Sequence, residues 1–222
     1  MKRILICLLL SISASLQAAI NLGQTRLIFE ENNKAATLEV NNNVDAPYMV
    51  QSWLDKGDPE QTPANLPMIV TPPILKLDGR KSAMLRVLYQ GNGLPENKES
   101  VLWLNVQEIP QANTTANGLQ LAQRIRIKVF YRPASLNMTL SEAVEKLQWR
   151  CTGNNITVDN PTPLHISLAS LHFSGRNMDI DMVNPYAQRT FSLPQAVPRH
   201  VAFTWINDYG GQTRVDNVAC HL

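Results

Sequence analysis

A long alternating segment at residues 119–131 carries the side chains with the clearest chemical potential. Its successive side chains fall on two faces, as in a β-strand. One face is apolar except at one position and comprises Leu119, Leu121, Gln123, Ile125, Ile127 and Val129. The other is polar and basic and includes Gln120, Arg124, Arg126 and Lys128. Because an average strand has about 5–6 residues, two interpretations stand: an ordinary half-buried strand, or one whose apolar row is partly open to a partner that adds a strand.

The sequence contains no arrangement of side chains typical of an enzyme. The motifs GxSxG and HExxH and a glycine-rich phosphate loop are absent, and the histidines lack metal-ligand spacing. His165 and His172 are seven positions apart in strand-like sequence, which places them on opposite faces and disfavours a shared metal. We therefore expect no catalytic residue, cofactor or metal site, and an exported hydrolase is a disfavoured alternative.

The N-terminus has the pattern of a secretory signal peptide. Lys2 and Arg3 precede an apolar run at residues 4–10, and small and polar residues follow up to Ala18. The apolar run is well short of the roughly 20 residues that span a bilayer. We predict a signal peptide at residues 1–18, cleavage before Ala19, and no membrane insertion of the mature chain.

The charge balance gives no general reason to expect a nucleic-acid partner. The chain has 20 basic and 18 acidic residues, and Lys2 and Arg3 lie in the predicted leader, so the mature chain is formally neutral. An anionic membrane surface is disfavoured for the same reason.

Two cysteines, Cys151 and Cys220, remain after the leader is removed. In an oxidising compartment an even pair favours a disulfide, while unpaired thiols or a reactive pair stay open as alternatives. A reactive or metal-binding pair is disfavoured because the CxxC spacing is missing. With 68 residues between the cysteines, closure would remove roughly 4 kcal/mol of chain entropy from the unfolded state.

The rest of the chain has the rhythm of an all-β protein. Short strand-like segments separated by turn-rich pieces occur at residues 25–30, 36–40, 48–54, 84–89 and 101–109 before the long segment, and at 155–158, 165–173, 179–183, 189–193, 200–207 and 212–219 after it. Pro133 ends the long segment, and residues 141–149 form a helical turn or an irregular lead-in. We predict two β-sandwich domains of immunoglobulin-like size, at residues 19–134 and 135–222.

Ordered motifs make the chain similar to the PapD-like chaperones of the chaperone–usher family. Arg-Ile-Lys-Val-Phe-Tyr-Arg-Pro at residues 126–133 resembles the end of the donor strand of these proteins. Four more blocks match in order: Thr-Arg-Leu-Ile-Phe at 25–29; Thr-Pro-Pro-Ile-Leu-Lys-Leu at 71–77 with the following 81–87; Glu-Ser-Val-Leu-Trp-Leu-Asn at 99–105, running to 110; and Asn-Pro-Thr-Pro at 160–163 with Ile-Asn-Asp-Tyr-Gly-Gly at 206–211. The similarity spans nearly the whole mature chain.

The resemblance implies a fold, a location and partners. It implies a boomerang of two immunoglobulin-like domains that works in the periplasm, caps pilus subunits by lending each a β-strand, and delivers them to an outer-membrane usher. It also implies that Arg26 and Lys128 anchor the C-terminal carboxylate of a subunit, for which charge-assisted donors are suited. A two-domain periplasmic adhesion or binding module would explain the domains but not these two motifs.

The resemblance further assigns the inserted side chains and an interdomain network. Leu119, Leu121 and Gln123 match the donor-strand positions. Gln123 departs from the hydrophobe common in relatives, and a buried amide there would need polar partners of its own.

Residues 111–118 match a loop of the short-loop branch, which is associated with rod-like pili. Glu99, Arg132 and Asp208 match an interdomain salt-bridge network. The alternative is scattered surface charges worth about 0–1 kcal/mol each.

Overall fold

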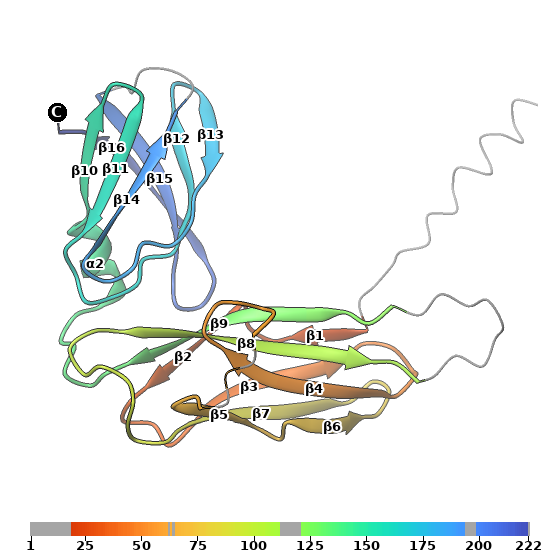
Figure 1. The fold of residues 1–222 in the computed structure, drawn as a ribbon. Coiled ribbons are helices and arrows are strands. Elements are labelled where there is room, and N and C mark those ends of the chain that lie inside the picture. Colours follow the sequence, from red (N-terminus) through yellow and green to blue (C-terminus); the bar gives the residue numbers. More distant parts are fainter. Residues whose placement is uncertain (1–18, 62, 64, 112–120, 194–198, 222) are drawn as a thin grey trace, which may run out of the picture.

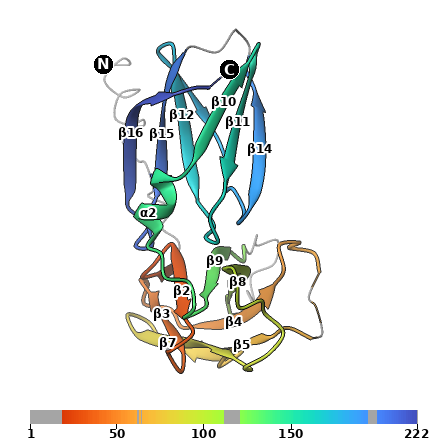
Figure 2. The same ribbon diagram turned by 90° about the vertical axis from the view of Figure 1, so that its left-hand side faces the viewer.

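The computed structural model describes residues 19–61, 63, 65–111, 121–193 and 199–221. They form two β-sandwiches set at an angle, so that the molecule has the shape of a boomerang (Figure 1). The view turned by 90° shows the C-terminal sandwich standing on one end of the N-terminal one (Figure 2). This confirms the predicted all-β fold of two immunoglobulin-like domains.

The N-terminal sandwich consists of two sheets. One has the strand order β1-β3-β7-β5 and contains β1 (Ile20–Leu22), β3 (Ala36–Asn42), β5 (Met68–Thr71) and β7 (Ser82–Tyr89). The other has the order β2-β9-β8-β4-β6 and contains β2 (Arg26–Glu30), β4 (Tyr48–Asp55), β6 (Ile74–Leu77), β8 (Ser100–Ile109) and β9 (Arg124–Arg132). Alternate residues such as Leu38, Leu104 and Val129 are fully buried in one core, as the two-residue period of a strand requires.

The C-terminal sandwich also has two sheets and a separate core. The first has the order β10-β11-β14, with β10 (Gln148–Thr152), β11 (Asn155–Asn160) and β14 (Ala187–Ser192). The second has the order β13-β12-β15-β16, with β12 (Leu168–Phe173), β13 (Arg176–Asp179), β15 (His200–Ile206) and β16 (Gln212–Ala219). Trp149 and Phe203, whose ring centroids are 4.9 Å apart, stack inside this core.

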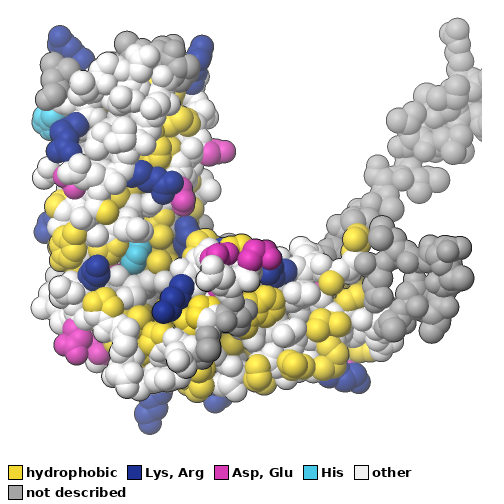
Figure 3. All heavy atoms as spheres, in the orientation of Figure 1, with side chains coloured by type: hydrophobic (Ala, Val, Ile, Leu, Met, Phe, Trp, Pro, Cys, Tyr) yellow, Lys and Arg dark blue, Asp and Glu magenta, His cyan; other side chains and the backbone are white. Residues whose placement is uncertain are grey.

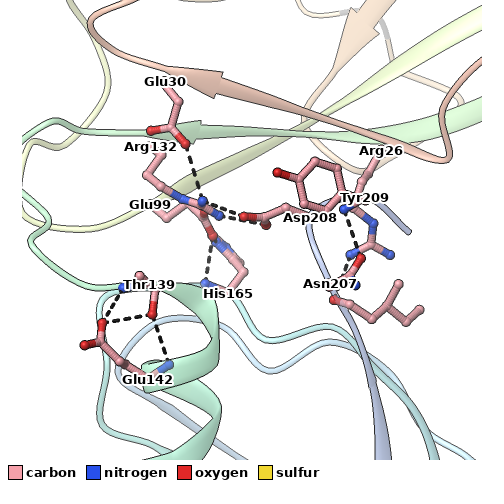
Figure 4. Close-up of polar contacts among 11 residues, drawn as sticks. Arg26, Glu30, Glu99, Arg132, Thr139, Glu142, His165, Asn207, Asp208 and Tyr209 are labelled. Carbon is pink, nitrogen blue, oxygen red and sulfur yellow. Dashed lines mark hydrogen bonds and ion pairs between the residues drawn. The ribbon is translucent and has the colours of Figure 1, made fainter. Parts of the chain in front are cut away.

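A short helix leads into the C-terminal sandwich. It is α2 (Leu140–Glu145), which lies in the segment expected to form a helical turn or an irregular lead-in. Thr139 and Glu142 form a reciprocal capping box: the Glu142 N–H donates to Thr139 Oγ1 at 3.3 Å, and the Thr139 N–H donates to Glu142 Oε2 at 2.7 Å (Figure 4). No helix among the described residues is both long and apolar enough to cross a bilayer.

The long strand differs from its predicted extent of residues 119–131. Leu119 lies outside the described residues, and β9 begins only at Arg124. The Glu108 N–H still donates to the Gln123 carbonyl at 3.0 Å. The partner strand β8 then ends at Ile109, and Pro110 has no N–H with which to continue the ladder.

Other strand boundaries also differ from the sequence pattern. Residues 179–183 do not form the predicted strand: β13 ends at Asp179, and Val183 makes only an isolated bridge to Ile166. The short strands β1, β5, β6 and β10 were not predicted, because segments of three to five residues are too short to show a clear alternation.

Candidate anion-binding site at the domain joint

Arg26 and Lys128 lie side by side on neighbouring strands. Strands β2 and β9 are parallel, and Arg26 is the register partner of Lys128, so both side chains point from the same face of the sheet. The opposite face of β9 carries Ile127 and Val129 into the core. Arg26 is 9% exposed and the Lys128 side chain 19%, which makes this a shielded pair of cations.

The Arg26 guanidinium has a donor that is not used. Its Nη1 donates to the Ile206 carbonyl of the C-terminal domain at 3.3 Å (Figure 4), whereas its buried Nε has no acceptor among the described residues. Burial lowers the pKa of Arg26, and the carboxylate of Asp208 opposes this effect. Because an unpaired buried donor is costly, the site favours an added acceptor.

The Lys128 ammonium faces a carboxylate of the other domain. Its Nζ is 3.6 Å from Asp181 Oδ1, and Asp181 also pairs with Arg189 at 3.3 Å. Burial lowers the pKa of Lys128, with a further lowering by Arg26, while Asp181 opposes both. No signal in the sequence identified Asp181, because nothing in a strand pattern shows which residue faces the other domain across the joint. Chemically, the arrangement can bind a carboxylate between two cations.

The two cations lie where the arms of the boomerang meet. Lys128 pairs with Asp181 of the C-terminal sandwich, and Arg26 bonds to Ile206 at the end of β15. Figure 3 shows the inner angle between the arms as an open, concave surface. An extended segment can therefore enter this angle and lie along β9.

Arg132 also connects the domains: it contacts three carboxylates, of which that of Asp208 belongs to the C-terminal domain (Figure 4). Its Nη1 and Nη2 donate to the two carboxylate oxygens of Asp208 at 2.8 and 3.0 Å, and its Nε donates to Glu99 Oε1 at 3.0 Å. Glu30 lies 3.4 Å from the same guanidinium. Burial acts to lower the pKa of Arg132, but the hydrogen bonds that it donates to Asp208 and Glu99, and the charges of these carboxylates, outweigh burial and raise the pKa. The structure thus brings together Glu99, Arg132 and Asp208.

Sequence reasoning missed Glu30 and also His165, which joins this network from the C-terminal domain. Its N–H and its Nδ1 contact Glu99 Oε2 at 2.8 and 3.0 Å, and its ring lies 5.7 Å from that of Phe130. The Glu99 side chain is 1% exposed, and its contacts with His165 link the residue just before β8 to the C-terminal domain. The only local signal is the neighbouring Asn-Pro-Thr-Pro motif, whose Pro163 carbonyl accepts from the Glu99 N–H at 2.9 Å.

The turn that holds Asp208 is packed tightly against the N-terminal domain. Asn207 Oδ1 accepts the N–H groups of Tyr209 and Gly211 at 3.0 and 2.8 Å. Gly210 has a φ of 85°, and an added Cβ would overlap the hydroxyl of Thr25. Glycine is therefore required here both by backbone conformation and by the close approach of the two domains.

Of the predicted donor residues, Leu121 and Gln123 lie just before β9, at the end far from the joint. Leu119 is outside the described residues. Leu121 is 66% exposed, and the Gln123 side chain is also exposed. Most of the predicted loop at residues 111–118 is likewise outside the described residues.

The disulfide is present. Cys151 is bonded to Cys220, with their Cα atoms 5.4 Å apart. This confirms the predicted disulfide over unpaired thiols or a reactive pair. No group of His, Cys, Asp and Glu among the described residues could hold a metal ion.

Comparisons with known proteins agree with this architecture. Residues 19–137 match the model of the pili and flagellar-assembly chaperone PapD N-terminal domain, and residues 142–217 match that of the pili assembly chaperone PapD C-terminal domain. The chaperone protein FimC of Escherichia coli K12 is 35% identical over 215 residues, which cover 95% of this chain and 88% of FimC. The chaperone protein MrkB of Klebsiella pneumoniae is 37% identical over 230 residues, covering 97% and 98% of the two chains.

A solved structure supports the same relationship. The Salmonella enterica SafB chaperone, in complex with the SafA pilin, matches with a TM-score of 0.80 and 27% identity, over 91% of this chain and 98% of that one. The chain therefore belongs to the PapD family of pili assembly chaperones, which are binding proteins and not enzymes.

Proposed function

We propose that this chain is a periplasmic chaperone that binds and caps pilus subunits by donor-strand complementation and delivers them to an outer-membrane usher. A subunit that lacks a strand exposes backbone groups and an apolar groove, which aggregates unless another strand fills it. The exposed segment just before β9, with Leu121 and Gln123, supports a role as that strand. The two-domain unit comprises residues 19–134 and 135–222.

One observation carries the proposal: a buried arginine with an unused donor lies beside a buried lysine. Arg26 and Lys128 are register partners at the joint, and the Arg26 Nε has no acceptor among the described residues. A subunit's C-terminal carboxylate can accept from Arg26 and pair with Lys128. The C-terminal strand of the subunit then runs along β9, in which apolar side chains alternate with basic ones.

The location and the usher follow from a different argument. The leader at residues 1–18 indicates export, and the Cys151–Cys220 disulfide suits an oxidising compartment. The outer-membrane usher is the partner of the chaperone–usher family that this chain resembles. Localisation by cell fractionation and copurification with a candidate outer-membrane usher test these two points.

Replacing either anchor is expected to abolish subunit protection without unfolding the protein. A charge-assisted hydrogen bond contributes about 1.5–3 kcal/mol, so Arg26→Ala and Lys128→Ala should each weaken subunit binding about tenfold or more. The measurement is the yield of soluble complex when each variant is co-expressed with candidate pilins. Circular dichroism and thermal unfolding of the purified variants serve as fold controls.

A matched control is available on the same strand. Arg124→Ala removes a cation from the same face of β9, but Arg124 contacts Trp53 and Pro59 instead of the joint. It should leave the complex yield close to that of the wild type. Normal complex yield from both anchor variants would contradict the proposed site.

Removing the Asp181 carboxylate, which faces Lys128, should strengthen subunit binding instead of weakening it. Asp181 pairs with the Lys128 ammonium, so an incoming carboxylate must displace it. Since exposed pairs contribute about 0–1 kcal/mol, Asp181→Asn should tighten subunit binding by up to about fivefold, measured by titration calorimetry. Asp179→Asn, which removes an equal charge two residues away, is the control. Weaker binding by Asp181→Asn would show that Asp181 helps to hold the subunit.

A further inference from the structure

The anchor pair is the end of a row of four residues that crosses the sheet. Strand register places Asp55 opposite Trp103, Trp103 opposite Lys128, and Lys128 opposite Arg26. Register partners point to the same face, so all four side chains share the face that points away from the N-terminal core. The row thus runs from Arg26 on β2, through Lys128 and Trp103, to the Asp55 carboxylate on β4.

Asp55 is fully buried, although it lies on the outer face of the sheet. Its carboxylate accepts from Arg126 Nε and Nη2 at 3.2 and 2.5 Å, from Asn105 Nδ2 at 2.7 Å, and from the Gly57 N–H at 2.7 Å. Burial acts to raise the pKa of Asp55, but these hydrogen bonds hold the pKa below its ordinary value. The group is therefore a charged, fully paired anion whose main partner is the two-bond fork of Arg126.

Arg126, which Asp55 holds in place, also contacts the Trp103 ring. The guanidinium carbon lies over the Trp103 ring, 4.2 Å from its centroid, and the Lys128 Nζ lies over the same ring at 5.2 Å. The turn after Asp55 packs here too, since a Cβ added at Gly57 would lie 3.7 Å from Trp103 Nε1. A cation over an indole ring is attracted to it, most strongly where water is excluded.

We infer that Asp55 and Arg126 are positioning residues, which hold Trp103 and, through it, the Lys128 ammonium at the point where the subunit carboxylate binds. The inference rests on the anchor role of the proposed function. Lysine is a point charge on a flexible stem of four carbons, and a freely moving stem must be ordered at each binding event. With the indole fixed, the ammonium is already in place.

The first experiment observes the position of Lys128 without any ligand. Lysines of the full mature protein are reductively dimethylated with ¹³C-formaldehyde, which keeps their charge, and the Lys128 signal is identified by its loss in Lys128→Arg. The Trp103 ring current should shift this signal away from those of exposed lysines. We expect the shift to collapse in Arg126→Gln and in Asp55→Asn, and to persist in Arg124→Gln.

Arg124→Gln is a matched control for charge. It removes a cation two positions away on the same face of β9, but Arg124 lies over the Trp53 ring. Each single variant leaves an unpaired charge, the buried Asp55 carboxylate in Arg126→Gln and the Arg126 guanidinium in Asp55→Asn, and this can destabilise the fold. The double variant Asp55→Asn with Arg126→Gln removes both charges together and provides a second test of the same link.

The second experiment measures the consequence for binding. The probe is the C-terminal strand peptide of a pilin whose complex with the wild-type protein has been isolated, synthesised as a free acid and as a C-terminal amide. We expect the preference for the acid to fall about tenfold in Arg126→Gln, equivalent to about 1.4 kcal/mol, with unchanged affinity for the amide. A purely structural role would weaken both peptides equally.

The outcomes separate the two hypotheses. A Lys128 signal that stays shifted in Arg126→Gln, or that collapses equally in Arg124→Gln, overturns the positioning role, as does an equal loss for acid and amide. If the signal responds as expected but the wild-type protein binds acid and amide equally, the positioning of Lys128 is supported and the anchor function fails.

Discussion

Arg132→Ala is expected to lower the free energy of unfolding by about 3–5 kcal/mol, the cost of breaking a buried ion pair by removing one partner. The Arg132 side chain is 11% exposed and that of Glu99 1%, so the substitution leaves a buried carboxylate without its cation. The same change removes both bonds to Asp208 in the C-terminal domain. The angle between the arms should therefore also become variable.

Two measurements test this prediction. Urea unfolding gives the loss of stability, and small-angle scattering of the free protein should show a broader distribution of interatomic distances. Arg214→Ala is the control, because Arg214 pairs with Asp216 on the surface, with side-chain exposures of 54% and 66%. It should change stability by no more than about 1 kcal/mol. An unchanged scattering profile together with an unchanged unfolding midpoint for Arg132→Ala would refute the prediction.

Removing the disulfide should cost about 2–5 kcal/mol and should act on the C-terminal domain alone. Cys151 lies in β10 of one sheet, and Cys220 follows β16 of the other, so the bond closes one edge of the sandwich. The backbone contributes as well: the Cys151 N–H donates to the His221 carbonyl at 2.8 Å. In the Cys151→Ser, Cys220→Ser double variant this edge should open.

Hydrogen exchange with peptide-level resolution distinguishes a local from a global effect. Protection should fall in β10 and β16, while the N-terminal core strands β3 and β8 keep theirs, because the two cores are separate. Mass analysis with and without reductant first confirms the bonded state of the wild type. Equal protection in the variant and the wild type would show that the backbone pairing alone holds this edge.

The sequence predicted those parts of the fold that depend on local pattern. The two-residue period of a strand is a local property, and it assigned Ile127 and Val129 to the core and Lys128 to the other face, as observed. The end of β9 before Pro133 and the turn around Gly210 also depend on local sequence. The number and spacing of the strand-like segments predicted two β-sandwich domains, and motif order added the family.

The candidate site could be predicted only as residue types. A motif can name Arg26, Lys128, Glu99, Arg132 and Asp208, but it contains no distances. Glu99 and His165 are 66 positions apart in the chain and meet only because the domains pack together. No periodicity could pair them, because contacts across a domain joint depend on how two independently folded surfaces fit.

By itself, then, the sequence determined the faces of the strands, the cysteine pair and the family, and it predicted an export signal. Tertiary structure alone decided that β9 starts at Arg124, that Asp181 faces Lys128, and that Asp55 lies buried beneath Arg126. The physical reason is the same in each case. Strand ends, ion pairs and burial are set by what the neighbouring strand or domain supplies, and that neighbour is distant in the chain.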